Sequence, residues 1–252
     1  MLSRMFRGST KGDAIHRAPT ATRVYAVGDV HGHLDLLSQM RDMISEDVKA
    51  DRRERNVIVY LGDYIDRGPD SRGVVELLLN EPLVGIEEIH LKGNHEDFML
   101  QFLDDPLIGE QWYLNGGDTT LASYGVERTV MTEGSDRFIA VRDRLRSKLP
   151  VEHLAFLRSL AMYHVEGDYL FVHAGIRPGR PMEKQEAHDV MWIRGEFLSS
   201  DADHGYCVVH GHSISPEPEL RRNRIGIDTG AFYTGRLTGL VLDGAEGRFL
   251  RT

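Results

Sequence analysis

The chain is poor in cysteine, in long apolar runs and in net positive charge, and each shortage excludes a class of protein. Cys207 is its single cysteine, so neither an intrachain disulfide nor a cysteine-based zinc cluster can form. No run of about 18 apolar residues is present, which argues against a membrane-spanning helix and a membrane partner. The 30 Lys and Arg are outnumbered by 39 Asp and Glu, and the formal net charge of −9 argues against nucleic acid as a partner.

The N-terminal segment 1–22 is basic and has no apolar stretch of the length that a secretory signal needs. We expect it to be a flexible tail, because chain ends fray unless they are tied down. A lone thiol without a signal peptide is typical of a reducing cytoplasm, so we expect a cytoplasmic protein. Cys207 itself lies in an apolar run and is expected to be a small core residue.

The remaining residues, 23–252, alternate short β-branched runs with glycine-rich turns and a few helices, which is typical of one α/β domain. Strands are expected at 24–29, 56–63, 86–96, 168–175, 206–213, 224–230 and 237–243. The last of these lie close together in sequence, as antiparallel strands do. Leu34, Leu37, Met40 and Ile44 have helical spacing, and a second helix is expected near 70–80. Residues 97–165 are predicted to form a helical cap inserted into two mixed sheets with helices outside.

Polar clusters flanked by glycine follow the apolar strands, at the position where loops bring side chains to one edge of a sheet. The clusters are Gly-Asp-Val-His-Gly (28–32), Gly-Asp-Tyr-Ile-Asp-Arg-Gly (62–68), Gly-Asn-His-Glu (93–96), His-Ala-Gly (173–175) and His-Gly-His (210–212). Each cluster alone is ordinary turn chemistry. Their succession, each after a strand, indicates one shared site.

The clusters supply oxygen and imidazole ligands, which suit Mn, Fe, Zn or another borderline divalent ion. The candidate ligands outnumber what one ion needs if water must also bind, so two ions that share a carboxylate use them economically. Asp63 is the natural bridge, because a carboxylate has two oxygens and Asp63 lies in the middle of the set. The candidate ligands are Asp29, His31, Asp63, Asn94, His173 and His212.

These motifs, in this order, resemble those of the phosphoprotein phosphatase family within the calcineurin-like metallophosphoesterases. The similarity covers residues 24–235, and Asn-Gly-Gly (115–117) and Trp-Ile-Arg (192–194) are similar to the bacterial and phage branch of serine/threonine phosphatases. The resemblance implies a four-layer α/β/β/α sandwich with a dinuclear metal centre. We expect two divalent ions, with Mn²⁺ first and Fe or Zn as alternatives.

The resemblance also assigns roles to residues. Asp29 and His31 would hold one ion, Asp63 would bridge, and Asn94, His173 and His212 would hold the other, while the role of His210 stays open. The catalytic set is His95, Asp66 and Arg67, with His95 as general acid and Asp66 orienting it. The phosphate would be bound by Arg67, Asn94 and Arg194.

These parts suit phosphate-ester hydrolysis by direct attack of a hydroxide that bridges the two ions. An acid must protonate the departing alkoxide, and Arg side chains match phosphate oxygens with two donors. We therefore expect a phosphatase of phosphoserine and phosphothreonine in proteins, with phosphotyrosine as a further option. Trp112, Tyr124 and Tyr233 are expected to pack rather than to stack on a nucleoside.

Three alternatives remain. A symmetrical bis(5'-nucleosyl)-tetraphosphatase has a similar pattern but usually lacks an Asp at the position of Asp66. A nuclease of this superfamily would have a second histidine where Ile214 stands. A non-catalytic module that kept the fold is disfavoured, because the chain retains every candidate ligand and the acid.

Overall fold

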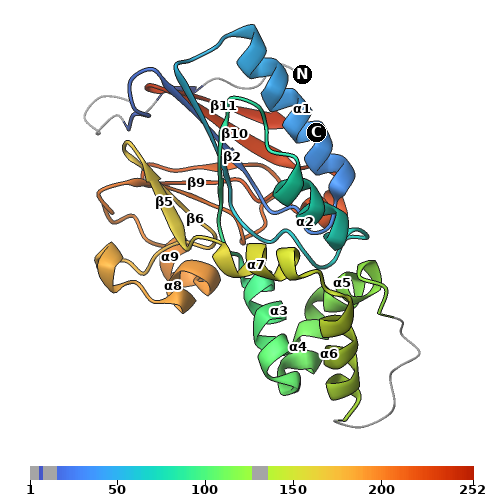
Figure 1. Ribbon diagram of the computed structural model, residues 1–252. Coiled ribbons are helices and arrows are strands. Elements are labelled where there is room, and N and C mark those ends of the chain that lie inside the picture. Colours follow the sequence, from blue (N-terminus) through green and yellow to red (C-terminus); the bar gives the residue numbers. More distant parts are fainter. Residues whose placement is uncertain (1–5, 8–15, 127–135) are drawn as a thin grey trace.

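The strands form two mixed sheets in a computed structural model that describes residues 6–7, 16–126 and 136–252 (Figure 1). The first sheet has the order β1-β11-β10-β2-β3-β4 and the second has the order β5-β6-β7-β9-β8. The strands of the first sheet are β1 (Phe6–Arg7), β2 (Thr22–Val27), β3 (Arg55–Tyr60), β4 (Glu87–His90), β10 (Thr238–Asp243) and β11 (Glu246–Arg251). Those of the second are β5 (Tyr163–Glu166), β6 (Tyr169–Val172), β7 (Cys207–His210), β8 (Glu219–Leu220) and β9 (Arg224–Gly226).

Alternation along the strands separates two faces of each sheet, because successive side chains point to opposite faces. In β3, Val57 and Val59 join the cluster between the sheets, while Ile58 packs in the cluster that contains α1 (Leu34–Ala50) and α2 (Ser71–Asn80). In β6, Phe171 faces the first sheet and Leu170 packs in the cluster with α8 (Ala187–Trp192) and α9 (Gly195–Leu198). The predicted α/β/β/α sandwich of two mixed sheets is therefore confirmed.

Helices α1 and α2 follow the sequence pattern closely. Leu37, Met40 and Ile44 are buried in α1, as their spacing predicts. The Asp70 side chain accepts a hydrogen bond from the Gly73 amide at 2.8 Å and begins α2. Helix α1 runs to Ala50, so it takes in the first half of the charged run 46–55 that was expected to follow the helix.

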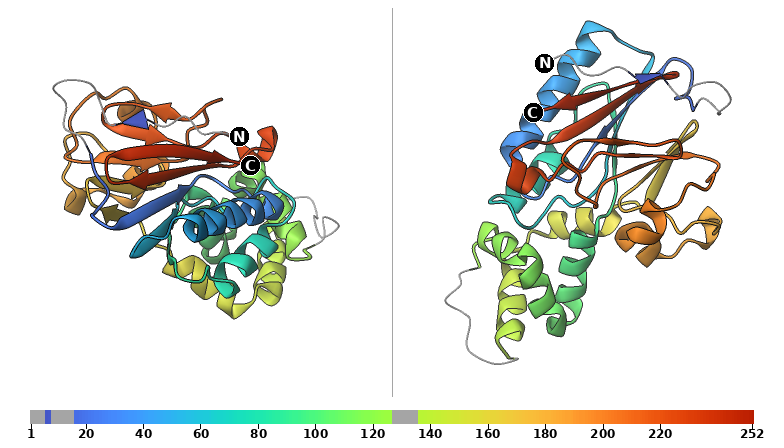
Figure 2. Two further views of the ribbon diagram at one scale, coloured as in Figure 1. Left: turned by 90° about the horizontal axis from the view of Figure 1, so that it is seen from above. Right: turned by 180° about the vertical axis from the view of Figure 1, so that it is seen from behind.

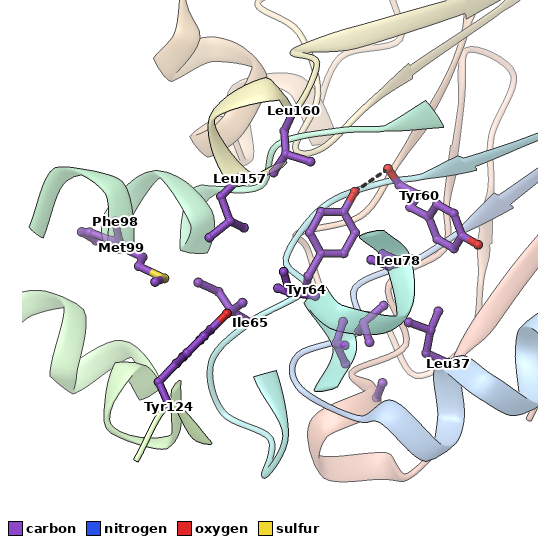
Figure 3. Packing of buried hydrophobic residues seen from close by; sticks show 14 of the residues in the cluster. Leu37, Tyr60, Tyr64, Ile65, Leu78, Phe98, Met99, Tyr124, Leu157 and Leu160 are labelled. Atoms are coloured by element: carbon purple, nitrogen blue, oxygen red, sulfur yellow. Dashed lines mark hydrogen bonds between the residues drawn. The ribbon is translucent and has the colours of Figure 1, made fainter. Parts of the chain in front are cut away.

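The helices expected in the cap gather at one end of the molecule, below the sheets in Figure 1 and in the right-hand view of Figure 2. One hydrophobic cluster joins them to α1 and α2, and Figure 3 shows Ile65 of the β3–α2 loop close to Met99 and Tyr124. The cap therefore has no separate core among the described residues. Its helices are α3 (Asn94–Asp104), α4 (Gly109–Trp112), α5 (Asp118–Ser123), α6 (Asp136–Lys148) and α7 (Val151–Ser159), with a 3₁₀ turn at Pro106–Ile108 and a π-helical turn at Tyr113–Gly117.

Three details differ from the sequence-based expectations. Strand β9 pairs in parallel with β7, whereas β10 lies in the other sheet and pairs antiparallel with β2, so the short spacing between them is not a hairpin. The segment between β9 and β10 instead crosses from one sheet to the other. Strands β5 and β11 were not expected, and β5 begins inside the range assigned to the cap.

Part of the predicted tail is anchored to the domain. Phe6 and Arg7 pair with β11, the Ala18 amide bonds to Gly244 O at 2.9 Å, and the Arg17 amide bonds to the Asp168 carboxylate at 2.8 Å. Residues 1–5 and 8–15 lie outside the described residues. No helix of the described chain is long and apolar enough to cross a membrane. The cytoplasmic location stays a prediction.

Candidate active site

Six parallel strands, three from each sheet, end at the edge where the candidate residues meet. Strands β2, β3 and β4 lead to Asp29, Asp63 and Asn94, and β6 and β7 lead to His173 and His212. The sixth strand, β9, leads to Asp228, which sequence reasoning missed. The signal was present, because Arg-Ile-Gly-Ile-Asp (224–228) also ends an apolar strand in an acidic residue.

The backbone is left-handed at many of these positions. Among the described residues, six other than glycine have positive φ, and five of them are predicted site residues. Such conformations cost of order 1–3 kcal/mol each and persist where the surrounding structure enforces them, often at functional sites. The five are His31 (47°), Asp63 (51°), Asp66 (71°), Arg67 (68°) and His212 (62°).

Asp63 lies at the centre of the site, where a bridging ligand would have to lie. Its Oδ2 lies 3.4 Å from Nε2 of His173, 3.7 Å from Nε2 of His31 and 3.9 Å from Nε2 of His95. Burial raises the pKa of Asp63, but His173 and His95 outweigh this and hold that pKa well below its usual value. The charge of Asp63 in turn raises the pKa of His173 to about 10, against the lowering effect of burial.

Two sets of side chains around Asp63 have the spacing of metal ligands: His31, Asp63 and His95, and Asp63, His173 and His212. The second set agrees with the predicted second ion, and Asn94 Oδ1 lies 3.0 Å from His173 Nε2. The first set contains His95, whereas Asp29 was the expected partner of His31 and Asp63 around the first ion. The Asp29 carboxylate instead accepts the backbone amide of His212 at 3.0 Å.

The chemistry of the site fits cations. Burial and the neighbouring carboxylates of Asp228 and Asp63 raise the pKa of Asp29 well above its usual value. The buried Nε2 of His212 has no hydrogen-bond partner, and burial lowers the pKa of this histidine to about 2. Like-charged carboxylates and an unpartnered imidazole nitrogen at one buried edge are costly without a positive charge between them. The predicted residues can therefore hold metal ions.

The His31 imidazole links the candidate ligands to Arg67. Its Nδ1 donates to Ile65 O at 3.0 Å, which leaves the Nε2 lone pair toward the site. Arg67 Nη1 donates to that lone pair at 2.9 Å. The Arg67 guanidinium also lies 4.6 Å from the ring centroid of Phe232, a contact that sequence reasoning missed. In this arrangement Arg67 is therefore bonded to the nitrogen through which His31 would bind an ion.

His95 and Asp66 form a buried pair, the contact that the predicted orienting role of Asp66 would need. His95 Nδ1 lies 2.7 Å from Asp66 Oδ2, so the opposite nitrogen, Nε2, faces Asp63. Burial lowers the pKa of His95, but Asp63 and Asp66 outweigh this and raise it overall. This shift favours the protonated form relative to a free imidazole, and in that form a proton lies on the nitrogen that faces the site.

Glu96 joins two of the motif loops, a role that was not predicted. Its buried carboxylate accepts the backbone amides of Gly93 and Asp63 at 2.9 Å, Tyr64 at 2.8 Å and Ile65 at 3.3 Å. A glutamate three residues after the cap of a helix is a known capping signal, so the sequence held this information. The loops after β3 and β4 are thereby fixed to each other.

Arg194 and His210 lie on opposite sides of the question of function. Arg194 Nη1 donates to His212 O at 3.1 Å, which places this exposed side chain beside the candidate ligands. His210 packs edge-on against Phe197, with ring centroids 5.2 Å apart. Its Nδ1 bonds to Gly211 O at 3.1 Å, and burial lowers its pKa to about 4. His210 is thus a core residue in the described structure.

Comparison with known proteins agrees with this geometry. The family model of the calcineurin-like phosphoesterases matches residues 22–232, which include every predicted site residue. The chain belongs to this family. The resemblance seen in the motifs is therefore confirmed at the level of a phosphoesterase that carries potential metal ligands.

Among curated proteins, this calcineurin-like phosphoesterase is similar to bis(5'-nucleosyl)-tetraphosphatases named PrpE and described as asymmetrical. The protein from Bacillus thuringiensis (strain Al Hakam) is 24% identical over 236 residues, which cover 85% of this chain and 88% of the relative. The protein from Oceanobacillus iheyensis is 26% identical over 238 residues, with 86% and 87% covered.

Solved structures with the same fold include proteins of different names. One, provisionally named a diadenosine tetraphosphatase, has a TM-score of 0.60 and 21% identity and covers 93% of this phosphoesterase and 97% of its own chain. The cold-active protein-tyrosine phosphatase of a psychrophilic Shewanella species has a TM-score of 0.57 and 17% identity, with 97% and 82% covered. At these identities the similarity shows the fold alone.

Proposed function

We propose that this phosphoesterase is a metal-dependent phosphomonoesterase that removes phosphate from serine and threonine side chains of proteins. The observation that supports this most is the buried His95–Asp66 pair, whose free nitrogen faces Asp63. A protonated imidazole held in this way suits the protonation of a basic leaving group, such as the alkoxide of serine or threonine.

In this proposal the chain holds two divalent ions through Asp29, His31, Asp63, Asn94, His173 and His212. Bound there, the ions would supply Lewis acidity and a nucleophilic water. Side chains of the chain itself bind the phosphate and protonate the leaving group. Arg67 and Arg194 bind phosphate oxygens through their planar guanidinium groups, and Asn94 assists from the amino end of α3. His95 donates its Nε2 proton to the leaving oxygen while Asp66 holds Nδ1. Mn²⁺ stays the first expectation for the metal.

The arrangement of Arg67 favours a role in substrate binding over a permanent contact with His31. A guanidinium binds phosphate oxygens through paired, charge-assisted hydrogen bonds that are stronger than its single bond to a neutral imidazole. Phe232 packs against one face of the guanidinium and leaves its edge for a ligand. Binding of an ion by His31 and of phosphate by Arg67 would then separate the two side chains.

The second candidate is hydrolysis of bis(5'-nucleosyl) tetraphosphates. It is favoured by the PrpE relatives, whose similarity covers most of both chains. Against it stands the chemistry of the leaving group, since a nucleotide phosphate is a far weaker base than an alkoxide and needs an acid less. The buried acid therefore favours the monoester.

The two candidates are separated by direct comparison of substrates. The Mn²⁺-loaded chain is assayed on phosphoserine, phosphothreonine and phosphotyrosine peptides beside diadenosine tetraphosphate. We expect a higher kcat/KM on the serine and threonine peptides, and loss of all turnover after chelation of the metal. A higher kcat/KM on the dinucleotide would establish the second candidate instead. The readout is inorganic phosphate for the peptides and mononucleotide products for the dinucleotide. Hydrolysis of none of these substrates by the metal-loaded chain would overturn both.

A further inference from the structure

Two cap residues donate hydrogen bonds to Asp66 in addition to the bond from His95. Trp112 Nε1 donates to Oδ2 at 2.8 Å, and Thr120 Oγ1 donates to Oδ1 at 2.6 Å. Trp112 is fully buried, and so are Thr120 and Asp66. Both carboxylate oxygens of Asp66 therefore have donors from the cap, 46 and 54 residues away along the chain.

The direction of the bond from Thr120 follows from its other contacts. A carboxylate oxygen accepts hydrogen bonds, so the single hydroxyl proton of Thr120 points to Oδ1. The lone pairs of Thr120 are then left for the Asp66 amide at 2.9 Å and for the Ser71 hydroxyl at 2.9 Å. Ser71 thus donates to Thr120, and Thr120 donates to Asp66. This chain of donors fixes both the backbone and the carboxylate of Asp66.

The Trp112 ring has little freedom to leave this position. It packs against Phe102 with ring centroids 5.0 Å apart. On another side it lies against Gly117, where a Cβ atom would come within 2.6 Å of the indole. Gly117 ends the turn at Tyr113–Gly117, which is kinked at Gly116, where φ is 98°. The turn and its small residue therefore make room for the indole that reaches Asp66.

We propose that Trp112 and Thr120 are positioning residues that hold the Asp66 carboxylate in the plane in which it orients His95. The proposal rests on the proposed function, because it assigns these residues to the protonation of the leaving group. If Asp66 turned, the Nδ1 bond would be lost and the His95 ring would no longer point Nε2 at the substrate. Removal of either cap donor would thus act on the acid and leave the binding of phosphate in place.

The test uses variants that remove one donor and keep most of the shape. Trp112→Phe keeps an aromatic ring without the N–H, and Thr120→Val keeps the branched shape without the hydroxyl. Thr120→Ser restores the hydroxyl and serves as the rescue. Tyr124→Phe is the matched control, because it removes a buried cap hydroxyl whose partner is His153 Nδ1, at 2.9 Å, and not Asp66.

Each full-length, Mn²⁺-loaded variant is assayed on phenyl phosphate and on p-nitrophenyl phosphate. Phenoxide is the more basic leaving group and depends more on the acid. We expect Trp112→Phe and Thr120→Val to lower kcat on phenyl phosphate about tenfold more than on p-nitrophenyl phosphate, a modest part of what a general acid contributes. KM should stay within about twofold, and Thr120→Ser and Tyr124→Phe should behave as the wild type does. Equal losses on both substrates, or the same selective loss in Tyr124→Phe, would overturn the proposal.

A second measurement decides the geometry without any turnover. In ¹H–¹⁵N spectra of the full chain, the indole N–H signal of Trp112 should move downfield of its position in Asp66→Asn, while that of Trp192 stays. An unchanged Trp112 signal would contradict the bond to Asp66 and the inference with it. If the wild type hydrolyses no monoester, the proposed function fails, and the indole signal still tests whether Trp112 holds Asp66.

Discussion

The carbonyl oxygen of Gly116 accepts a hydrogen bond from the backbone amide of Arg67 at 3.1 Å, which joins the cap to the loop after β3. Gly116 has a φ of 98°, and a Cβ atom there would lie 2.8 Å from both N and Cγ of Arg67. Arg67 itself is left-handed, with a φ of 68°. The conformation of a candidate phosphate-binding residue thus depends on a glycine that lies 49 positions later in the sequence.

Gly116→Ala is expected to displace Arg67 and weaken phosphate binding. Loss of about one charge-assisted hydrogen bond to the phosphate would raise KM about tenfold, with a smaller effect on kcat. Steady-state kinetics on p-nitrophenyl phosphate measure this. The matched control is Gly85→Ala, which has the same left-handed cost of about 1–2 kcal/mol but no atom within 4 Å of the new methyl group. A similar KM in the two variants would contradict the link between Gly116 and Arg67.

His95→Asn is expected to discriminate between leaving groups. Without the acid, hydrolysis of phosphoserine should fall by roughly a hundredfold or more, because its alkoxide must leave unprotonated. Hydrolysis of p-nitrophenyl phosphate should fall much less. The ratio of the two kcat values, compared with that of the wild type, is the measurement. An equal loss on both substrates would remove His95 from the acid role.

Asp63→Asn is expected to limit the chain to one bound ion. Asp63 Oδ2 faces the nitrogens of His31 and His173 from opposite candidate sets, and an amide is a weaker ligand that cannot neutralise two cations. Metal analysis by mass spectrometry after Mn²⁺ loading and gel filtration gives the number of ions per chain. Asp35→Asn, whose side chain is 80% exposed, is the control for loss of an acidic charge. Two ions per chain in Asp63→Asn would rule out the bridge.

Asp243 offers a pH-dependent test of stability outside the site. Burial raises its pKa, but hydrogen bonds from Arg23 and Arg53 outweigh this and hold the pKa below the usual 3.8. The ionised form is therefore the one that stabilises the fold. This contribution is complete above the unfolded-state pKa and is lost as pH falls through the lowered folded-state pKa.

Asp243→Asn should accordingly lower the free energy of unfolding by about 1–2 kcal/mol near pH 7, because Asp51 remains as a partner of Arg23. The difference from the wild type should shrink as pH falls below about 4, where the wild-type carboxyl also becomes neutral. Urea unfolding at several pH values measures it. Asp35→Asn should show no such trend, and a difference that did not depend on pH would contradict the electrostatic explanation.

Local patterns predicted most of the framework because short-range physics decides them. The spacing of Leu37, Met40 and Ile44 gives α1 its buried face whatever it packs against. The apolar runs before Asp29 and Asp63 form strands for the same reason. The sheet partners were harder, since nothing local distinguishes β9, which pairs in parallel with β7, from a hairpin partner of β10. Pairing depends on the route of the connecting chain.

The sequence by itself determined which residues gather at the site, because motif residues at strand ends must meet where parallel strands end. It placed Asp63 in the middle of the set, and the family resemblance led us to expect the pairing of His95 with Asp66. Only the tertiary structure decided which cap groups reach that pair. Trp112 and Thr120 lie in segments whose local pattern indicates packing alone, and their bonds to Asp66 exist because a shared core and the kink at Gly116 bring distant segments together. Packing between segments far apart in the sequence decides contacts of this kind. Local residue patterns therefore do not predict them.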